Sequence, residues 1–338
     1  MGGWRFMRRG GISLTMDCDP MPLAPLGRGN SRPVHSTICC VIDQHPRFYV
    51  ELVLWTICAQ RHLPTANAQI VVYFVGNPPS DIADWLRARG VKTRIIAPMV
   101  EGSPHCNKIA PFLDAHETDA TVVTDADLFF VKDPSLFLGG PRFRAPPNNH
   151  ANPPPHIFRS ILAASGMGHA YKPGLALYAN ASGMRETHIN NISGGIVAAP
   201  RNRSHQLATL WRKWALWLVD NRELMGRWAV HVDQVAFALT MEELGQSVEF
   251  LPPQTNTILH SLTQIANVYA FHLTTGHIPR FPERFNADRT LATNGVAPGV
   301  ASAIGKLNEC IREATTVISS LPSTKDHMEK FMNPKWKR

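Results

Sequence analysis

The chain has 338 residues, of which 44% are hydrophobic and 18% are charged, and its formal net charge is +8. These values are ordinary for a globular protein and allow one large domain, or two small ones, with a sizeable core. No apolar run reaches the roughly 18 to 20 residues that a membrane-spanning helix needs, and the 27 prolines and 23 glycines indicate many loops rather than a long coiled coil.

The N-terminus and the cysteines favour a reducing compartment. The first segment, MGGWRFMRRGGISLTM, contains arginines but lacks an apolar stretch long enough for a secretory signal. Residues 1–33 are therefore expected to form a disordered or poorly ordered tail, and the expected location is cytoplasmic. The six cysteines are scattered without a C-x-x-C pair, so we interpret them as reduced core residues rather than disulfides or zinc ligands.

The positive charge is concentrated in the middle of the chain. Residues 128–222 contain eleven lysines and arginines against three acidic residues. Such a segment favours an anionic partner, either a phosphate-bearing ligand, a membrane surface or nucleic acid, although a solvated surface is the ordinary alternative. The basic residues are not interleaved with stacking aromatic residues, so a nucleic-acid partner is not expected, whereas a peripheral membrane contact is compatible with the charge.

Strands and helices alternate through the first part of the chain. Short apolar runs rich in β-branched residues indicate buried strands, and the segments between them have helical spacing. Pro46 lies in the first turn of one helix, whereas Ser80 can cap the next helix and Gly90 can end it. Such alternation predicts a parallel sheet with helices on both faces. The expected strands are 35–43, 69–76, 91–98 and 120–130, and the expected helices are 46–63, 81–90 and 107–117.

The second part of the chain is less regular. Residues 142–156 are rich in proline and asparagine and are expected to form a loop over the sheet edge. The helix predicted at 204–221 has Trp211 and Trp214 on one apolar face, which is typical of a core rather than of a ligand platform. Further helices are expected at 156–165, 231–245 and 299–321, and further strands at 189–200, 247–253 and within 267–279.

Two carboxylates lie at the end of the most hydrophobic strand. The stretch TVVTDADLFFVKDP (121–134) has Asp125 and Asp127 among valines and phenylalanines, where an unpaired anion is costly. Because ligands bind beyond the carboxyl ends of such strands, this is the position of a site. Both carboxylates of a D-x-D can reach one cation, and Mg²⁺ or Mn²⁺ prefers oxygen ligands that it bridges to phosphates. Two separately solvated acids in a loop are the alternative.

A second candidate cluster lies in AFHLTTGHIP (270–279). His272 follows a short apolar strand there and is either a ligand or an ordinary core or surface histidine. Gly276 would let the backbone approach a phosphate closely, and His277 or Arg280 could contact that phosphate.

Together these segments resemble the GT-A glycosyltransferases, in particular glycosyltransferase family 8 and its bacterial relatives. The resemblance covers roughly residues 36–285 and is strongest from Asn107-Lys108 through the D-x-D to Asp133-Pro134. It implies an α/β GT-A fold, with a Rossmann-like, mostly parallel sheet flanked by helices. The implied organisation is a single GT-A domain over 34–290, followed by a C-terminal helix and basic tail over 291–338.

The resemblance also implies a metal site. In the family both aspartates of the D-x-D bind manganese, which holds the diphosphate of a nucleotide sugar, and this carries over to Asp125 and Asp127. HLTTGHIP resembles the family's H-x-x-G-x-x-K-P segment, whose histidine is the third metal ligand, so His272 takes that role. The glycine comes one residue later here, and Ile278 stands where the family has lysine.

Donor-binding and catalytic residues follow from other matched positions. SGGIVAAP resembles the family's N-S-G-V strand, with Ser193 at the asparagine position, and HVDQ contains a pair like the D-Q that lies beside the sugar in the family. The end of the first strand is where the family holds the uridine. The resemblance therefore assigns Asp233 and Gln234 as catalytic residues, and Ile42, Asp43, Lys108, Asp125, Ala126, Gly194, Gly195, Gly276 and His277 as donor-binding residues.

The expected function is metal-dependent transfer of a sugar from a nucleotide diphosphate donor, a UDP-sugar, to an acceptor hydroxyl, with Mn²⁺ or Mg²⁺ as cofactor. The resemblance implies retention at the anomeric carbon, with Asp233 as an inverting base being the alternative. A nucleotidyltransferase on the same fold and a D-x-D phosphohydrolase are left open.

The sequence does not identify the acceptor, which is expected to be a sugar, a lipid-linked acceptor or a protein. The variable segment 141–190 is expected to contact it, with Arg142, Arg144 and Arg159 facing an acidic acceptor or a membrane.

Overall fold

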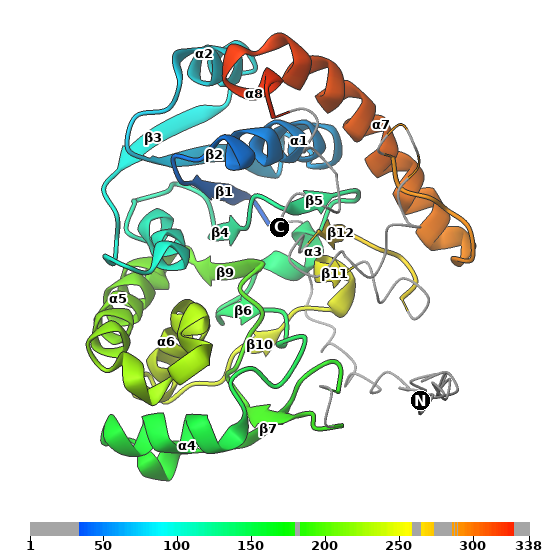
Figure 1. The fold of residues 1–338 in the computed structure, drawn as a ribbon. Helices are drawn as coiled ribbons and strands as arrows, with labels where there is room; N and C mark the ends of the chain where they lie inside the picture. The colour runs from blue at the N-terminus through cyan, green and yellow to red at the C-terminus, as the bar shows by residue number, and fades with distance from the viewer. Residues whose placement is uncertain are drawn as a thin grey trace, which may run out of the picture.

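A mixed seven-stranded sheet forms the centre of the protein (Figure 1). The computed structural model describes residues 34–179, 183–258, 265–273, 286, 288 and 290–327. The strand order is β10-β6-β9-β4-β1-β2-β3, and β9 runs antiparallel to its neighbours β4 and β6. The predicted mostly parallel sheet flanked by helices is confirmed. The strands are β1 (Ser36–Ile42), β2 (Ala68–Val75), β3 (Lys92–Ile96), β4 (Ala120–Thr124), β6 (Arg144–Ala145), β9 (Ile196–Pro200) and β10 (Glu249–Phe250).

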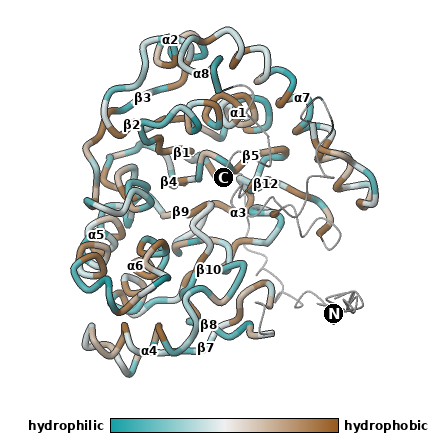
Figure 2. Tube along the Cα trace, viewed as in Figure 1, coloured by the Kyte–Doolittle hydropathy of each residue, from teal (hydrophilic) through white to brown (hydrophobic). Residues whose placement is uncertain are grey.

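Helices cover both faces of the sheet because the strand side chains alternate between two cores. Cys40 and Val72 pack into the core that includes α1 (Pro46–His62) and α7 (Pro298–Ser320). The neighbouring residues on the strands face the core formed with α5 (Ser204–Asp220) and α6 (Val232–Glu243). Figure 2 shows hydrophobic stretches along the central strands and α1.

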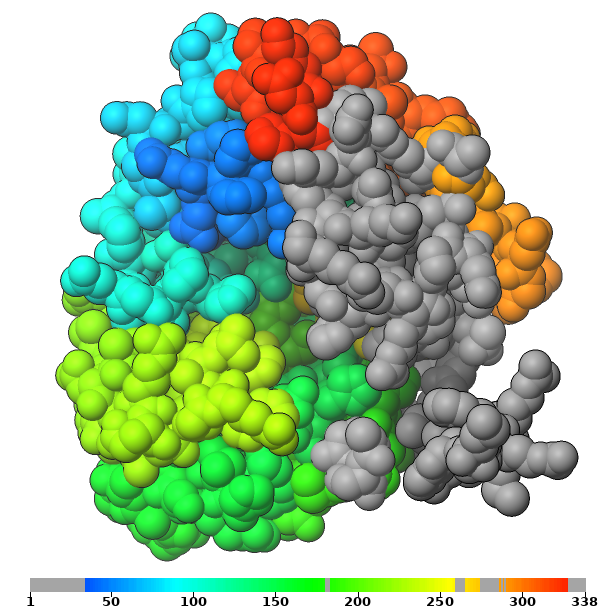
Figure 3. Space-filling view, viewed as in Figure 1, coloured from blue at the N-terminus to red at the C-terminus, as the bar shows by residue number. Residues whose placement is uncertain are grey.

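The C-terminal helices pack on the N-terminal ones. The apolar face of α7 contacts α1, and α8 (Pro322–Lys325) lies beside α2 (Ser80–Ala88), where Ser323 donates two hydrogen bonds to Asp81. Figure 3 shows the red segment at the top directly against the blue and cyan one. The C-terminal helix predicted from the sequence is therefore part of the same core. No helix in the described ranges is both long and apolar enough to cross a bilayer.

A second, small sheet adjoins the end of β4. It consists of β11 (Thr257–Ile258), β12 (Ala270–His272) and β5 (Leu128–Phe130), with β12 in the middle and antiparallel to β5. The sequence predicted one strand over 120–130, which is wrong. The chain leaves the large sheet after Thr124 and turns through the D-x-D, with the Leu128 N–H donating to the Asp125 carbonyl oxygen. The two aspartates thus occupy a turn between two sheets.

Several element boundaries differ from prediction. The helix expected at 107–117 is a 3-10 helix over Pro104–Phe112, called η1, which contains Pro111 and so lacks one backbone donor. Ser80 is the first helical residue of α2 rather than its cap, which is Pro79. The strand expected at 189–200 comprises only β9. The prediction of tryptophans in the core is confirmed, since Trp211 and Trp214 are buried.

The remaining elements are short and lie away from the centre of the large sheet. The loop expected at 142–156 contains the two-residue strand β6 and is followed by α4 (Pro155–Ala164). A small hairpin joins β7 (Pro173–Leu175) to β8 (Glu186–His188). The other short elements are α3 (Ser135–Leu138) and the 3-10 segments η2 (Gly168–Ala170), η3 (Arg201–Arg203), η4 (Arg222–Leu224), η5 (Gly226–His231) and η6 (Pro253–Asn256).

Candidate metal and donor site

Backbone hydrogen bonds hold the D-x-D turn in place. The Asp125 N–H donates to the Gly195 carbonyl oxygen at 3.0 Å, and the Leu273 N–H donates to the Asp127 carbonyl oxygen at 2.8 Å. Ahead of the turn, the indole of Trp55 donates to the Thr124 hydroxyl at 2.9 Å. The two carboxylates are therefore anchored to β9, to the end of β12 and to α1.

His272 completes a cluster of three possible metal ligands. Its Nε2 lies 3.1 Å from Asp127 Oδ1 and 3.7 Å from Asp125 Oδ2, and one ligand atom from each of the three residues lies within 4.8 Å of the others. Adjacent ligands about 2.1 Å from an octahedral ion lie about 3.0 Å apart. Two carboxylate oxygens and one imidazole nitrogen suit Mn²⁺ or Mg²⁺. The residues present thus fit a divalent cation.

The two carboxylates also change the protonation of His272. Burial lowers the pKa of this imidazole, but the Asp127 and Asp125 charges more than offset burial and raise the pKa above its ordinary value. The two carboxylates therefore favour a positive charge at this position. A bound cation would supply that positive charge instead.

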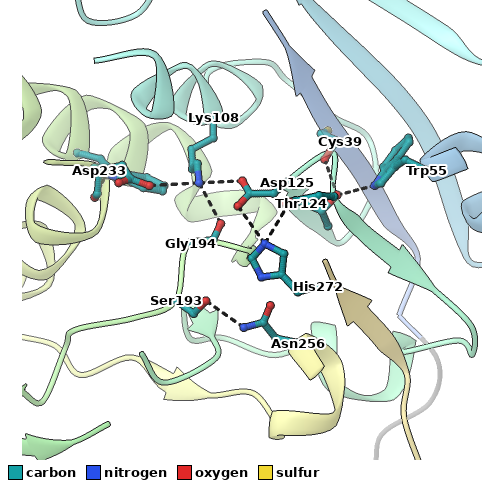
Figure 4. Close-up of polar contacts among 12 residues, drawn as sticks. Cys39, Trp55, Lys108, Thr124, Asp125, Ser193, Gly194, Asp233, Asn256 and His272 are labelled. Atoms are coloured by element: carbon teal, nitrogen blue, oxygen red, sulfur yellow. Dashed lines mark hydrogen bonds and ion pairs between the residues drawn. The ribbon is translucent and has the colours of Figure 1, made fainter. Parts of the chain in front are cut away.

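Lys108 links the D-x-D to α6 (Figure 4). Its ammonium donates to Asp125 Oδ1 at 2.9 Å and to the Gly194 carbonyl oxygen at 3.0 Å, and it lies 3.2 Å from Asp233 Oδ2. Burial lowers the pKa of Lys108, but the charges of Asp125 and Asp233 outweigh that effect and raise the pKa above its usual range. Lys108 is therefore a buried cation held by two carboxylates.

Gly194 leaves the space that this contact requires. A Cβ at this position would lie 2.9 Å from Lys108 Nζ and 3.0 Å from Asp233 Oδ2. Any side chain would push the lysine or the carboxylate away. The glycine therefore serves the packing of the ion pair, which the sequence did not predict.

Asp233 and Gln234 lie in the first turn of α6. The Asp233 carboxylate, 4% exposed, benefits from the positive end of the helix dipole as well as from Lys108. Gln234 Oε1 accepts a hydrogen bond from Asn148 Nδ2 at 3.2 Å. Asn148 lies in the Pro/Asn-rich segment, which the sequence indicated only as a loop, so its contact with the D-Q pair was missed.

The other predicted donor residues differ in accessibility. Asp43, after β1, accepts a hydrogen bond from Asn107 Nδ2 at 2.8 Å. Burial raises the pKa of Asp43 and outweighs the lowering effect of the Asn107 hydrogen bond, so the net shift is upward. Ile42 and Ala126 are buried, so the Ile42 side chain belongs to the core rather than to a ligand surface. Gly276, His277, Arg280, residues 1–33 and the basic tail from 328 lie outside the described residues.

Comparison with solved structures identifies the fold. The galactosyltransferase LgtC in complex with donor and acceptor sugar analogues is similar, with a TM-score of 0.51 and 12% identity over 87% of this chain and 99% of that one. An active-site glutamine-to-glutamate mutant of LgtC gives a TM-score of 0.52 and 12% identity over 88% of this chain and 100% of that one. This chain has the GT-A fold.

The GT-A fold assignment depends on structure and not on sequence similarity. Mouse xyloside xylosyltransferase 1 in its apo form gives a TM-score of 0.45 and 16% identity over 72% of this chain and 98% of that one. This similarity is too low to support the fold assignment. No family model and no curated protein sequence matches the chain. Within the GT-A fold, the turn after β4, the end of β12 and the start of α6 meet at one site.

Proposed function

We propose that this chain transfers a sugar from a nucleotide diphosphate donor, a UDP-sugar, to an acceptor hydroxyl in a reaction that depends on Mn²⁺ or Mg²⁺. The observation that carries the proposal is the cluster of Asp125, Asp127 and His272, whose ligand atoms lie within 4.8 Å of one another at the end of a central GT-A strand. A cation at this position would stabilise the negative charge that develops on the departing diphosphate of a nucleotide sugar.

In this proposal each group around the cluster has a separate task. Asp125, Asp127 and His272 would hold the cation, which supplies charge neutralisation for the departing diphosphate. Asp43 and the backbone of Ile42 would bind the nucleoside, while Ala126, Gly194 and Gly195 would contact the donor. Gly276 and His277 are proposed to contact the diphosphate, as inferred from their sequence alone.

Retention is the stereochemical outcome that we propose. An inverting enzyme needs a general base that removes the acceptor proton. The Asp233 carboxylate is buried and lies 3.2 Å from the Lys108 ammonium, so it is engaged in an ion pair rather than free to face an acceptor hydroxyl. The family 8 resemblance also supports retention. Asp233 and Gln234 would instead orient the sugar, with Lys108 holding Asp233.

The proposed acceptor region is the segment that precedes β9. Asn148 belongs to it and contacts Gln234, so the Pro/Asn-rich segment reaches the catalytic pair. Of the three arginines expected to face the acceptor, Arg144 does not: its guanidinium binds Glu249 at 2.8 Å and the Phe137 carbonyl oxygen. Arg159 pairs with Glu186 and stays partly exposed, and Arg142 is exposed. A cytoplasmic location with peripheral membrane contact remains part of the proposal.

The test is a screen of UDP-sugars with and without Mn²⁺, which measures UDP release in the presence of simple glycosides. Asp127→Asn is expected to abolish release while leaving the unfolding midpoint within a few degrees of the wild type, because asparagine has nearly the same volume as aspartate and this side chain is partly exposed. Asp84→Asn, which removes an exposed acid on α2, is the matched control.

The products distinguish the alternatives. Pyrophosphate released from a nucleoside triphosphate and a sugar phosphate would indicate a nucleotidyltransferase, and phosphate released from a simple ester without acceptor would indicate a phosphohydrolase. Near wild-type sugar transfer by Asp127→Asn at saturating Mn²⁺ would refute the metal-site assignment. The anomeric configuration of the product, read by NMR, tests retention.

A further inference from the structure

Two buried polar atoms lie next to the Gly195 backbone, beside the metal-ligand cluster. His272 Nδ1 and Asn256 Oδ1 are both buried, and neither has a hydrogen-bond partner among the described residues. A Cβ on Gly195 would lie 2.6 Å from Asn256 Oδ1 and 2.7 Å from His272 Nδ1. Both atoms therefore border the same small space next to the Gly195 backbone.

The amide of Asn256 is fixed in this position. It lies at the end of the 3-10 turn Pro253–Asn256, and its Nδ2 donates to the Ser193 hydroxyl at 2.9 Å. Figure 4 shows the amide nitrogen directed toward Ser193 and the oxygen directed toward the His272 ring. Asn256 is 1% exposed, so water does not compete freely for its oxygen.

The proton on His272 decides whether these two atoms can pair. When Nε2 binds a cation the imidazole is neutral, and its one proton must be on Nδ1. A buried N–H without an acceptor costs free energy, which would weaken cation binding. Asn256 Oδ1 is an acceptor that borders the same space as Nδ1, and the two atoms are not hydrogen-bonded in this structure. If the amide were turned the other way, two donors would meet.

We infer that Asn256 is a positioning residue for the metal site, accepting a hydrogen bond from His272 Nδ1–H and so holding the imidazole in the tautomer and ring orientation in which Nε2 binds the cation. Gly195 belongs to the same arrangement, since any side chain there would separate the two groups. Ser193 holds the other end of the amide. This inference rests on the metal site of the proposed function and not on sugar transfer.

The first test is calorimetric titration of the metal-free protein with Mn²⁺ alone. Asn256→Leu removes the acceptor with little change in volume and is expected to raise the dissociation constant about tenfold or more, the usual effect of losing an outer hydrogen bond to a ligand. Asn256→Asp keeps an oxygen toward Nδ1, and the Ser193 hydroxyl can donate to the other oxygen, so its Mn²⁺ affinity should stay within about threefold of the wild type or exceed it.

Thr255→Val is the matched control, because Thr255 belongs to the same turn and its hydroxyl donates to the Pro252 carbonyl oxygen without touching the Asn256 amide. Its Mn²⁺ affinity is expected to equal that of the wild type. An Asn256→Leu protein that binds Mn²⁺ within threefold of the wild type would overturn the inference. So would a Thr255→Val protein that is weakened as much, since the effect would then belong to the packing of the turn.

A spectroscopic readout keeps the inference testable if Asn256→Leu does not fold. In wild-type protein with ¹⁵N-labelled histidine and saturating Mg²⁺, which is diamagnetic, His272 should be protonated at Nδ1 and unprotonated at Nε2. An unprotonated Nδ1 in that state would exclude the hydrogen bond. The two proposals can also fail separately. If Asp127→Asn loses Mn²⁺ binding and Asn256→Leu keeps it, the assignment of the metal site stands and only the role of Asn256 is rejected.

Discussion

Lys108 and Asp233 form a buried ion pair of 3.2 Å that joins the helical segment before the D-x-D strand to the first turn of α6. Neither side chain is more than 8% exposed. Lys108 also binds Asp125, so two carboxylates of the site share one ammonium. Removing it would leave a buried anion at Asp233 without a counter-charge, and such uncompensated charges are strongly destabilising.

Lys108→Met is therefore expected to lower the free energy of unfolding by about 3 kcal/mol. Adding Asp233→Asn to it should restore part of the loss, because the unpaired anion disappears. Urea unfolding of the metal-free wild type, both single variants and the double variant measures the coupling. If the effects of the two substitutions simply add to within about 0.5 kcal/mol, the pair does not contribute as described.

Two glycine-to-alanine substitutions should have opposite effects on stability. Gly194→Ala inserts a methyl group 2.9 Å from Lys108 Nζ, so we expect it to separate the ion pair and lower the free energy of unfolding by about 1 to 3 kcal/mol. Gly305→Ala, inside α7 with no heavy atom within 4 Å of the new Cβ, should raise it by about 0.5 to 1 kcal/mol. Thermal unfolding of both variants is the measurement, and a Gly194→Ala protein as stable as Gly305→Ala would contradict the packing argument.

His231, which precedes Asp233, should make the protein sensitive to acid. Burial lowers the pKa of His231 below its ordinary value of 6.5, nearby Asp233 offsets part of this, and His105 lowers the pKa further. As the pH falls, His231 is therefore protonated in the unfolded chain at a higher pH than in the folded protein. The stability that neutral His231 contributes is complete above about pH 6.5 and is lost progressively below that pH.

Between about pH 7 and pH 5, the free energy of unfolding is therefore expected to fall more steeply for the wild type than for His231→Gln. The two slopes should differ by no more than about 1.4 kcal/mol per pH unit, the effect of one proton. His169→Gln, which changes an exposed histidine, is the control. Parallel pH profiles for wild type and His231→Gln would show that burial does not disfavour the charged form of this side chain.

Of the three arginines proposed to face the acceptor, Arg142 is exposed, whereas Arg144 pairs with Glu249 and Arg159 with Glu186. Replacement of Arg142 by glutamine should leave UDP affinity within about threefold, or about 0.7 kcal/mol, because exposed charges are screened over about 8 Å at physiological salt. Binding to vesicles that contain anionic lipid should weaken, and more so at low salt. Arg144→Gln should instead lower stability, since Arg144 holds Glu249. A large loss of UDP affinity in Arg142→Gln would indicate that this segment closes on the donor.

The sequence alone determined the βα alternation, the position of Asp125 and Asp127 at the end of a central strand, and the candidacy of His272. These follow from local rules: periodic apolar residues specify strands and helices, and carboxylates next to a buried strand require a positive partner. The tryptophans of α5 were assigned to the core for the same reason, and they are buried.

The tertiary structure decided which distant residues meet. The 120–130 segment is divided between two sheets because β5 pairs with β12, a strand far along the chain, and this pairing brings His272 to the aspartates. The resemblance placed Lys108 at the site, but its ion pairs with Asp125 and Asp233 were not predicted, and neither was the Asn148 contact with Gln234. Such contacts join residues far apart in the sequence and form only after the strands and helices have packed. For the same reason Arg144, which resembles a surface cation in the sequence, lies bound to Glu249 inside the fold.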